Sequence, residues 1–283
     1  MRLIFPRRPF PPIASTPIYL SILMKIKRLV PFALLALAGS QVSAAVVSNY
    51  QSGDIFLGVR VSGGTGQASS YLVDLGADTK FTNATGTFTL TSLGNLGADL
   101  QSLYGANWSS RADLSIGIFG ALGSGPAATL YASRQRLSLE VASEPWPLLN
   151  SSGRSGTLSQ INSVRNAYNG KNSTSNSPFA ITQSNDSSSA SYNFQVATPG
   201  VLDFGGSSQW DSIEAIGTSG ITNTALDFYK ISPSAVTSPG YFTINDSGAL
   251  TFTVVPEPAS LLLLAFAGAL VGSIRLRRPT TAA

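Results

Sequence analysis

The sequence contains neither cysteine nor histidine, and only 11% of its 283 residues are charged. An average soluble domain has about 25% charged residues. Without cysteine the chain forms no disulfide and offers no thiolate. Without histidine it builds neither a Ser-His-Asp nor a Cys-His catalytic centre, nor a His-ligated zinc site. We therefore expect no cofactor and no metal site. We also recognise no catalytic set of residues, so we do not expect an enzyme.

The formal charge of +4 is unevenly distributed along the chain. Residues 1–44 carry six basic groups and no acidic one, and residues 257–283 carry a net charge of +2, which leaves −4 for the region between them. A domain that binds nucleic acid needs a basic face. We therefore expect no nucleic acid among the partners of this protein.

Residues 24–44 have the pattern of a secretory signal. A basic start is followed by the apolar stretch 29–38 and by the small-residue exit Val42-Ser43-Ala44. This order predicts a signal helix that the Sec machinery recognises and that signal peptidase removes after Ala44. Residues 1–23 precede a complete signal that begins with its own methionine, so we interpret them as a mis-annotated start or a long basic region of the signal.

Near the C-terminus, the chain has a second apolar stretch at 259–274, which contains no charged residue. A bilayer span needs about 20 apolar residues, with about 17 as the lower limit. The stretch therefore predicts a short transmembrane helix. The basic residues that follow it favour a cytoplasmic C-terminus, which would leave the body of the chain, 45–254, outside the inner membrane.

Two further features flank this stretch in a fixed order. They are the motif residues Val255, Pro256, Glu257 and Pro258 on one side and the basic residues Arg275, Arg277 and Arg278 on the other. This arrangement, over 255–278, resembles the PEP-CTERM sorting signal of Gram-negative bacteria. The same tail is also labelled an ice-binding protein C-terminal domain, a label that by itself says nothing about ice binding by the body.

The resemblance implies an exosortase-type membrane protease as a partner and processing near the Pro-Glu-Pro motif. It also implies a transient inner-membrane intermediate, delivery to the cell surface, outer membrane or extracellular matrix, and an association with exopolysaccharide and biofilm. An ordinary permanent C-terminal anchor is the alternative interpretation of the same residues.

The body of the chain, 45–254, is dominated by segments in which apolar and polar residues alternate. This pattern predicts a mainly β, antiparallel β-sandwich or jelly-roll-like ectodomain. Helical spacing predicts one or two short helices, over 95–104 and 157–168, and the polar stretch 171–189 predicts an exposed loop. The predicted strands cover 54–61, 70–75, 86–91, 113–119, 128–133, 137–141, 191–196, 226–231, 241–244 and 249–254.

Three tryptophans, Trp108, Trp146 and Trp210, are candidate glycan contacts because aromatic faces pack on the apolar faces of sugars. The alternative is that they fill the core. Pro145 and Pro147 flank Trp146 and favour an exposed loop at that position.

Other residue patterns point less clearly to a ligand. Thr85, Thr87, Thr89 and Thr91 alternate along one predicted strand, but an ice-binding surface needs several such rows and threonine on a solvated strand is ordinary. Calcium bound by loop aspartates such as Asp74 and Asp78 is considered, although no EF-hand spacing is present.

A glycosidase needs two carboxylates about 5–10 Å apart. Sequence alone does not give that distance. The carboxylates considered are Asp99, Asp113, Glu140, Glu144, Asp203, Asp211 and Glu214.

Together these features predict an exported surface or matrix protein with a structural or adhesive role linked to exopolysaccharide. A carbohydrate-binding, lectin-like module is the first alternative. A secreted glycan-active enzyme is the second.

Overall fold

The computed structural model describes residues 46–47, 50–197, 213–217 and 220–255. Several sequence predictions concern positions outside these ranges and are therefore not described structurally: the signal helix, Ala44, Trp210, Pro256, Glu257, Pro258, the apolar stretch 259–274 and the three arginines after it. Within the described ranges, no helix is both long enough and apolar enough to cross a membrane.

The described residues form twelve strands and four α-helices, with short 3₁₀ turns between them. The strands are β1 Val46–Val47, β2 Asp54–Val61, β3 Ser69–Ala77, β4 Phe88–Thr89, β5 Leu114–Leu122, β6 Thr129–Gln135, β7 Lys171–Asn172, β8 Ala180–Ser184, β9 Glu214–Ile216, β10 Ala225–Ile231, β11 Val236–Ile244 and β12 Leu250–Val254. The helices are α1 Thr79–Thr82, α2 Leu96–Tyr104, α3 Ser151–Tyr168 and α4 Tyr192–Ala197.

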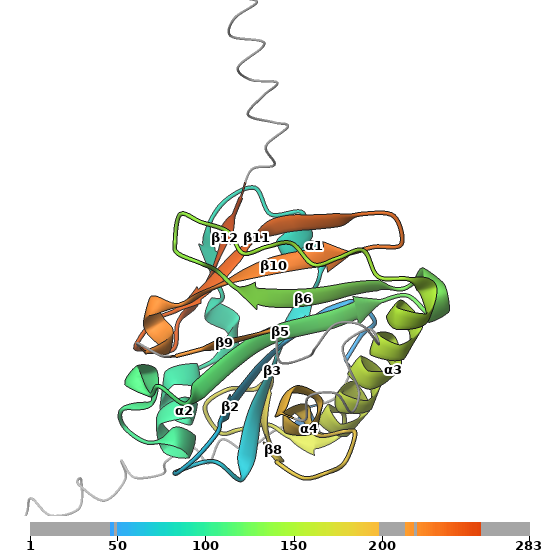
Figure 1. Cartoon of the computed structure of the whole chain (residues 1–283). Coiled ribbons are helices and arrows are strands. Elements are labelled where there is room, and N and C mark those ends of the chain that lie inside the picture. Colours follow the sequence, from blue (N-terminus) through green and yellow to red (C-terminus); the bar gives the residue numbers. More distant parts are fainter. Residues whose placement is uncertain (1–45, 48–49, 198–212, 218–219, 256–283) are drawn as a thin grey trace, which may run out of the picture. The chain divides into compact units, whose positions relative to one another are not determined.

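Ten of the strands form one antiparallel sheet in the order β4-β12-β11-β10-β6-β5-β2-β3-β8, with β9 paired to β5 outside this path. The nine strands of the path form a curled half-barrel (Figure 1). The prediction of a mainly antiparallel β domain with few helices is therefore confirmed. The two facing sheets of a sandwich are not seen among the described strands, because the ladder is continuous from β4 to β8.

The sheet is apolar on both faces. In β2, Ile55, Leu57 and Val59 belong to one core cluster, whereas Phe56 belongs to another, because successive side chains of a strand point to opposite faces. We call the first side the phenylalanine face, after the rings of Phe81, Phe88, Phe228, Phe242 and Phe252, and the second side the α3 face.

Helices cover both faces. Phe81 of α1 and Leu100 of α2 are fully buried on the phenylalanine face, and Ile161 and Val164 of α3 are fully buried on the α3 face. The prediction of α2 is confirmed. Helix α3 begins six residues before the predicted start, because Asn150 and not Thr157 caps it: the Asn150 side chain accepts a hydrogen bond from the Gly153 N–H at 2.7 Å.

Three of the predicted elements are wrong. In place of the strand predicted over 191–196, helix α4 spans Tyr192–Ala197, and Tyr192, Gln195 and Val196 are buried at helical spacing. Residues 137–141 form a tight loop closed by the Leu137 N–H and the Val141 carbonyl, 3.1 Å apart. The supposed loop 171–189 contains β7 and the edge strand β8.

Candidate functional site

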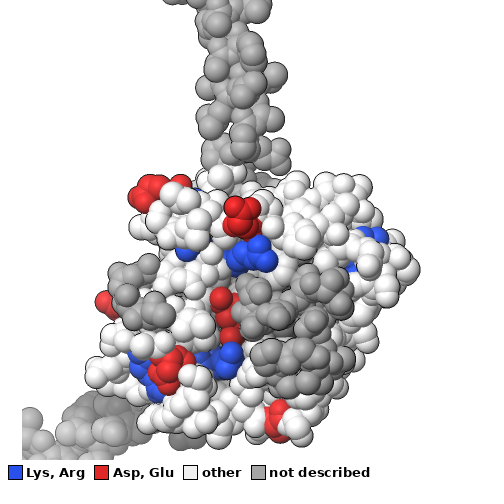
Figure 2. Space-filling view, viewed as in Figure 1, with Lys and Arg blue, Asp and Glu red and all other residues white. Residues whose placement is uncertain are grey.

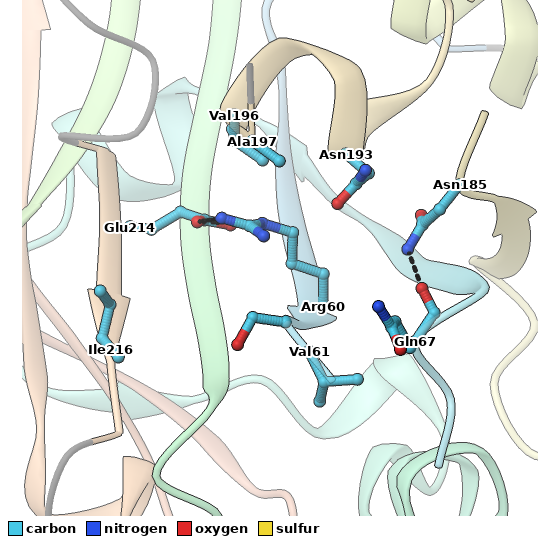
Figure 3. A pocket seen from close by; sticks show the side chains of 10 residues that line it. Arg60, Val61, Gln67, Asn185, Asn193, Val196, Ala197, Glu214 and Ile216 are labelled. Carbon is cyan, nitrogen blue, oxygen red and sulfur yellow. Dashed lines mark hydrogen bonds and ion pairs between the residues drawn. The ribbon is translucent and has the colours of Figure 1, made fainter. Parts of the chain in front are cut away.

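A polar pocket of about 680 Å³ lies where β2, the turn after it, helix α4 and strand β9 meet (Figure 3). Four different parts of the chain supply its walls. The lining residues are Arg60, Val61, Ser62, Gln67, Asn185, Asn193, Val196, Ala197, Glu214 and Ile216.

An ion pair between Arg60 of β2 and Glu214 of β9 forms one wall of the pocket (Figure 3). The Arg60 Nη2 lies 2.6 Å from Glu214 Oε2, and its Nε lies 3.0 Å from Oε1. The Arg60 side chain is 13% exposed and the Glu214 side chain 2%. This two-pronged geometry fixes both side chains, and it leaves the wall without net charge.

Tyr192 of α4 makes a further hydrogen bond to the Glu214 carboxylate. Its hydroxyl donates to Glu214 Oε1 at 2.9 Å, and its side chain is fully buried. Burial, followed by the nearby Glu214 charge, raises the pKa of Tyr192 well above its ordinary value of 10.0. The hydroxyl therefore stays protonated and remains a donor to the carboxylate.

Two glycines make room for the Tyr192 ring. Gly58 of β2 is paired directly with Gly117 of β5. A Cβ at Gly58 would lie 2.6 Å from Tyr192 Cε1, and one at Gly117 would lie 2.7 Å from the Tyr192 hydroxyl oxygen. The ring thus lies in a slot in the sheet that any larger pair of residues would fill, and this slot places the hydroxyl against Glu214.

Side-chain amides form the opposite wall. Asn185 is held in place because its Oδ1 accepts from the Ser70 hydroxyl at 2.6 Å and its Nδ2 donates to the Gln67 carbonyl at 2.7 Å. Asn193 of α4 and the side chain of Gln67 point toward the same space (Figure 3). The pocket therefore combines neutral donors and acceptors with the small apolar groups of α4.

The arrangement suits a neutral ligand rich in hydroxyl groups. Amides and a neutralised Arg-Glu pair can donate to and accept from hydroxyls, whereas a charged ligand would find no uncompensated opposite charge in the described lining. On the face that Figure 2 presents, most of the described surface belongs to residues without a formal charge, and several basic and acidic side chains lie side by side.

The tryptophans suggested as glycan contacts do not line this pocket. Trp108 and Trp146 are each 3% exposed, and they lie in the clusters on opposite faces of the sheet. The expectation of an exposed Trp146 is wrong. The Arg134 guanidinium lies 4.3 Å from the Trp146 ring centre and also donates to the Glu144 carbonyl at 2.8 Å, which fixes the loop over the sheet.

The suggested carboxylates are not brought together either. Asp99 accepts from the Tyr71 hydroxyl at 2.7 Å, and Asp113 pairs with Arg111, whose hydrogen bonds lower the Asp113 pKa. Glu140 and Glu144 are exposed on the loop before α3. Asp203 and Asp211 lie outside the described residues. Only Glu214 lines the pocket.

Asp74 and Asp78, the aspartates suggested as calcium ligands, are not part of a metal site among the described residues. In the described ranges, no group of three or more aspartate or glutamate side chains is placed to hold a metal ion. Asp78 instead accepts a hydrogen bond from the Tyr131 hydroxyl, and Asp74 accepts from the Gly76 N–H at 2.8 Å.

The threonine pattern is only partly on a strand. Thr89 lies on β4, and its hydroxyl is 3.0 Å from that of Thr251 on β12. Thr251 is in turn paired with Thr243 on β11. Thr85 and Thr87 precede β4, and Thr91 begins a 3₁₀ turn. The result is one short row across three strands, not the alternating strand face that the sequence suggests.

Of the residues predicted to form a sorting motif, only Val255 lies in the described part of the chain. Strand β12 ends at Val254, and the Val255 N–H donates to the Pro239 carbonyl at 3.2 Å. The regular pairing of the body therefore continues up to the residue before Pro256.

Most of the pocket could not be recognised from the sequence. Arg60 and Glu214 are 154 positions apart in the chain, and no motif joins them. One signal was available: Gly58 lies within the alternating pattern of a strand, and such a glycine indicates close approach by another group.

No protein-family model, no curated protein and no solved structure matches this chain. The sequence signals and the geometry of the pocket are therefore the basis for a proposed function.

Proposed function

We propose that the protein is exported and sorted to the cell surface or extracellular matrix of a Gram-negative bacterium, where it has a structural or adhesive role linked to exopolysaccharide. One observation carries the proposal. The first described strand begins at Val46, two residues after the signal cleavage site Ala44, and the last ends at Val254, directly before the motif. Cleavage at both signals would therefore leave every described element intact.

The chemistry of the motif supports its role as a processing site. Pro256 and Pro258 have no N–H to donate to a neighbouring strand, and each disfavours helix in the residue before it. A protease binds its substrate as an extended segment with free backbone groups. In this proposal the apolar stretch 259–274 holds the motif at the membrane surface, and Arg275, Arg277 and Arg278 stop translocation.

Mass spectrometry of the mature protein tests this proposal. We expect a C-terminus near Pro256–Pro258, and we expect the double change Pro256→Ala and Pro258→Ala to leave the tail attached. Pro233→Ala, in an exposed turn between β10 and β11, is the matched control and should be processed normally. An intact Arg275–Ala283 tail on the surface protein would contradict processing and would favour a permanent anchor.

Carbohydrate binding is the second candidate function, and the pocket is the observation that favours it. Sugars present many hydroxyls and no charge, which matches the amide groups and the neutralised Arg60–Glu214 pair. An enzyme acting on glycans receives less support, since a second carboxylate is needed and the described lining contains only Glu214.

A glycan array with the purified protein separates these candidates. Asn193→Ala removes an amide that lines the pocket and whose side chain makes no hydrogen bond within the described residues, so we expect about fivefold weaker binding at unchanged stability. Asn107→Ala, at an exposed asparagine near α2, is the control. Equal binding by both variants would exclude the pocket as the glycan site. Polysaccharide turnover that Glu214→Gln abolishes would favour the enzyme.

A further inference from the structure

The loop Leu137–Val141 exposes three large apolar side chains within five residues. Leu137 is 73% exposed, Leu139 56% and Val141 51%. Single exposed apolar residues are normal on a protein surface, whereas a group of them marks an interaction site. The other large apolar residues that are exposed in the described ranges lie singly on separate segments: Val46, Leu122, Leu148, Phe179 and Ile216.

Local hydrogen bonds give this loop a fixed conformation. The N–H groups of Leu137 and Ser138 donate to the Val141 carbonyl at 3.1 and 3.2 Å. The Ser138 hydroxyl oxygen accepts from the N–H groups of Glu140 and Val141 at 3.2 and 3.1 Å. Four backbone N–H groups of the loop therefore find acceptors within the loop itself, while its three large apolar side chains are exposed.

Both ends of the loop are attached to one buried carboxylate. Asp227 is fully buried; one of its oxygens pairs with Arg136, and the other accepts from the N–H and the hydroxyl of Ser143 at 2.6 and 2.9 Å. The Tyr229 hydroxyl also donates to the Ser143 carbonyl at 2.9 Å. A buried charge is costly unless it is fully paired. Here the pairing holds an apolar loop away from the core.

The loop lies close to the end of the described domain. The Arg136 guanidinium stacks 4.3 Å from the ring centre of Tyr241, and Tyr241 is paired with Thr253 on β12. In Figure 1 the segment that contains the loop leaves β6 and crosses in front of β10, on the side of the sheet near β12. Thr253 is two residues from Val255, where the described chain ends.

The length of chain beyond Val255 limits the distance to the membrane. Ala259, the first residue of the apolar stretch, is four residues further along the sequence. An extended chain covers about 3.5 Å per residue, so Ala259 lies at most about 14 Å from Val255. When the stretch occupies the bilayer, the surface around the end of β12 must therefore be near the lipid headgroups.

We propose that the loop Leu137–Val141 contacts the lipid surface of the inner membrane while the chain is held there by residues 259–274. This proposal rests on the membrane intermediate of the proposed function. Leucine and valine gain by leaving water at the interface. Glu140 is exposed on the same loop, so its carboxylate limits the contact to the headgroup region. The contact would fix the orientation of the body before processing.

The absence of cysteine makes a direct test possible, because one introduced cysteine can be labelled alone. Leu139→Cys in the full chain carries an environment-sensitive fluorophore, and the protein is reconstituted into vesicles of phosphatidylethanolamine and phosphatidylglycerol. The matched control is Ser187→Cys, at an exposed position after the opposite edge strand β8. We expect a blue shift and quenching by a lipid-attached quencher at position 139, and neither at position 187.

The outcomes separate this proposal from the one on which it rests. If the chain floats with the vesicles but the label at 139 reports water, the loop contact is wrong and the membrane intermediate stands. If the chain does not associate with vesicles, the intermediate fails and the loop contact fails with it. A blue shift that appears without vesicles and grows with protein concentration would assign the loop to a contact between copies of the chain, and would overturn the lipid proposal.

Discussion

On the phenylalanine face, five aromatic rings pack with centre-to-centre distances such as 4.8 Å for Phe242 and Phe252, whereas the α3 face contains two buried arginine ion pairs. The buried carboxylates Asp78 and Asp99 of the phenylalanine side accept from tyrosine hydroxyls. The α3 face also packs aromatic rings, for example Phe56 against Phe119 with ring centres 5.5 Å apart. The two faces therefore both bury an apolar, aromatic cluster, and they differ in the two arginine ion pairs of the α3 face.

Ring packing and ion pairs contribute different properties to the fold. Packing of phenylalanine rings is non-directional and contributes stability through buried area. Ion pairs are weak evidence for stability, because desolvation offsets their attraction, but their geometry is directional. On the α3 face they place surface features: Glu214 fixes Arg60 at the pocket, and Asp227 fixes the loop Leu137–Val141.

Phe228→Ala should produce the largest effect. Phe228 is fully buried and its ring contacts Tyr131, Phe81 and Phe242. Removing a buried phenylalanine ring costs about 4 kcal/mol of unfolding free energy, which urea denaturation measures. Phe179→Ala, at a residue that is 46% exposed, is the control and should change the free energy by less than about 0.5 kcal/mol. Similar losses for both variants would mean that burial of the Phe228 ring is not the source of its contribution to stability.

Asp227→Asn should have the next largest effect, about 3 kcal/mol, because it leaves Arg136 buried without its partner charge. In addition, amide hydrogen exchange should rise between Arg136 and Ser143, because the uncharged asparagine binds both residues more weakly than the Asp227 carboxylate does. Asp246→Asn, at an exposed turn, should change neither quantity. Loss of stability with unchanged exchange in the loop would mean that Asp227 does not position it.

Gly58→Ala should cost about 2 kcal/mol, because the new methyl group overlaps the Tyr192 ring. Gly86→Ala is the control, since a Cβ at Gly86 meets nothing within 4 Å. Adding Tyr192→Leu to Gly58→Ala should recover part of the loss, as expected for two residues that share one space. If the two substitutions are additive, the slot described for Tyr192 is not the reason for the glycine.

The pattern of alternation explains why much of the sheet could be predicted. The predicted strand 54–61 coincides with β2, and 70–75 lies within β3. In β2 the prediction succeeds because Leu57, Val59 and Val61, spaced two positions apart, lie in the same core cluster. Helix α4 could not be recognised in this way. Tyr192, Phe194 and Val196 alternate in the sequence, as in a strand, whereas packing into the Gly58–Gly117 slot selects a helix that buries Tyr192 and Gln195.

The site was less predictable than the fold because it depends on long-range pairing. Gly58 and Gly117 are paired across two strands, and neither sequence position reveals the other. Trp146 shows the same limit: its flanking prolines suggest an exposed loop, but Arg134, twelve positions earlier, covers the ring. A single sequence indicates the local backbone conformation that each segment prefers, whereas contacts between distant segments decide which side chains are exposed.

Asp74 provides the smallest test of the difference between the faces. It is the cross-strand neighbour of Phe56 on the α3 face, and within the described residues its carboxylate accepts a hydrogen bond from the Gly76 N–H, not from a tyrosine hydroxyl or an arginine. Burial raises the pKa of Asp74 from 3.8 to about 6; the Gly76 N–H and Lys80 oppose this rise, and Asp54 adds to it.

Because its pKa is higher in the folded state than in the unfolded chain, Asp74 favours folding when protonated. Its contribution is therefore complete below pH about 4 and is lost as the pH rises through about 6. Asp74→Asn keeps the Oδ1 acceptor for the Gly76 N–H but cannot ionise, so it should be more stable than the original chain at pH 7.5, by about 1 kcal/mol after allowance for partial exposure, and equal to it near pH 4. Urea denaturation at both pH values measures the difference. A constant offset between the two proteins from pH 4 to pH 7.5 would mean that the Asp74 carboxyl is as well solvated in the fold as in the unfolded chain, and that only the arginine-paired carboxylates distinguish the α3 face.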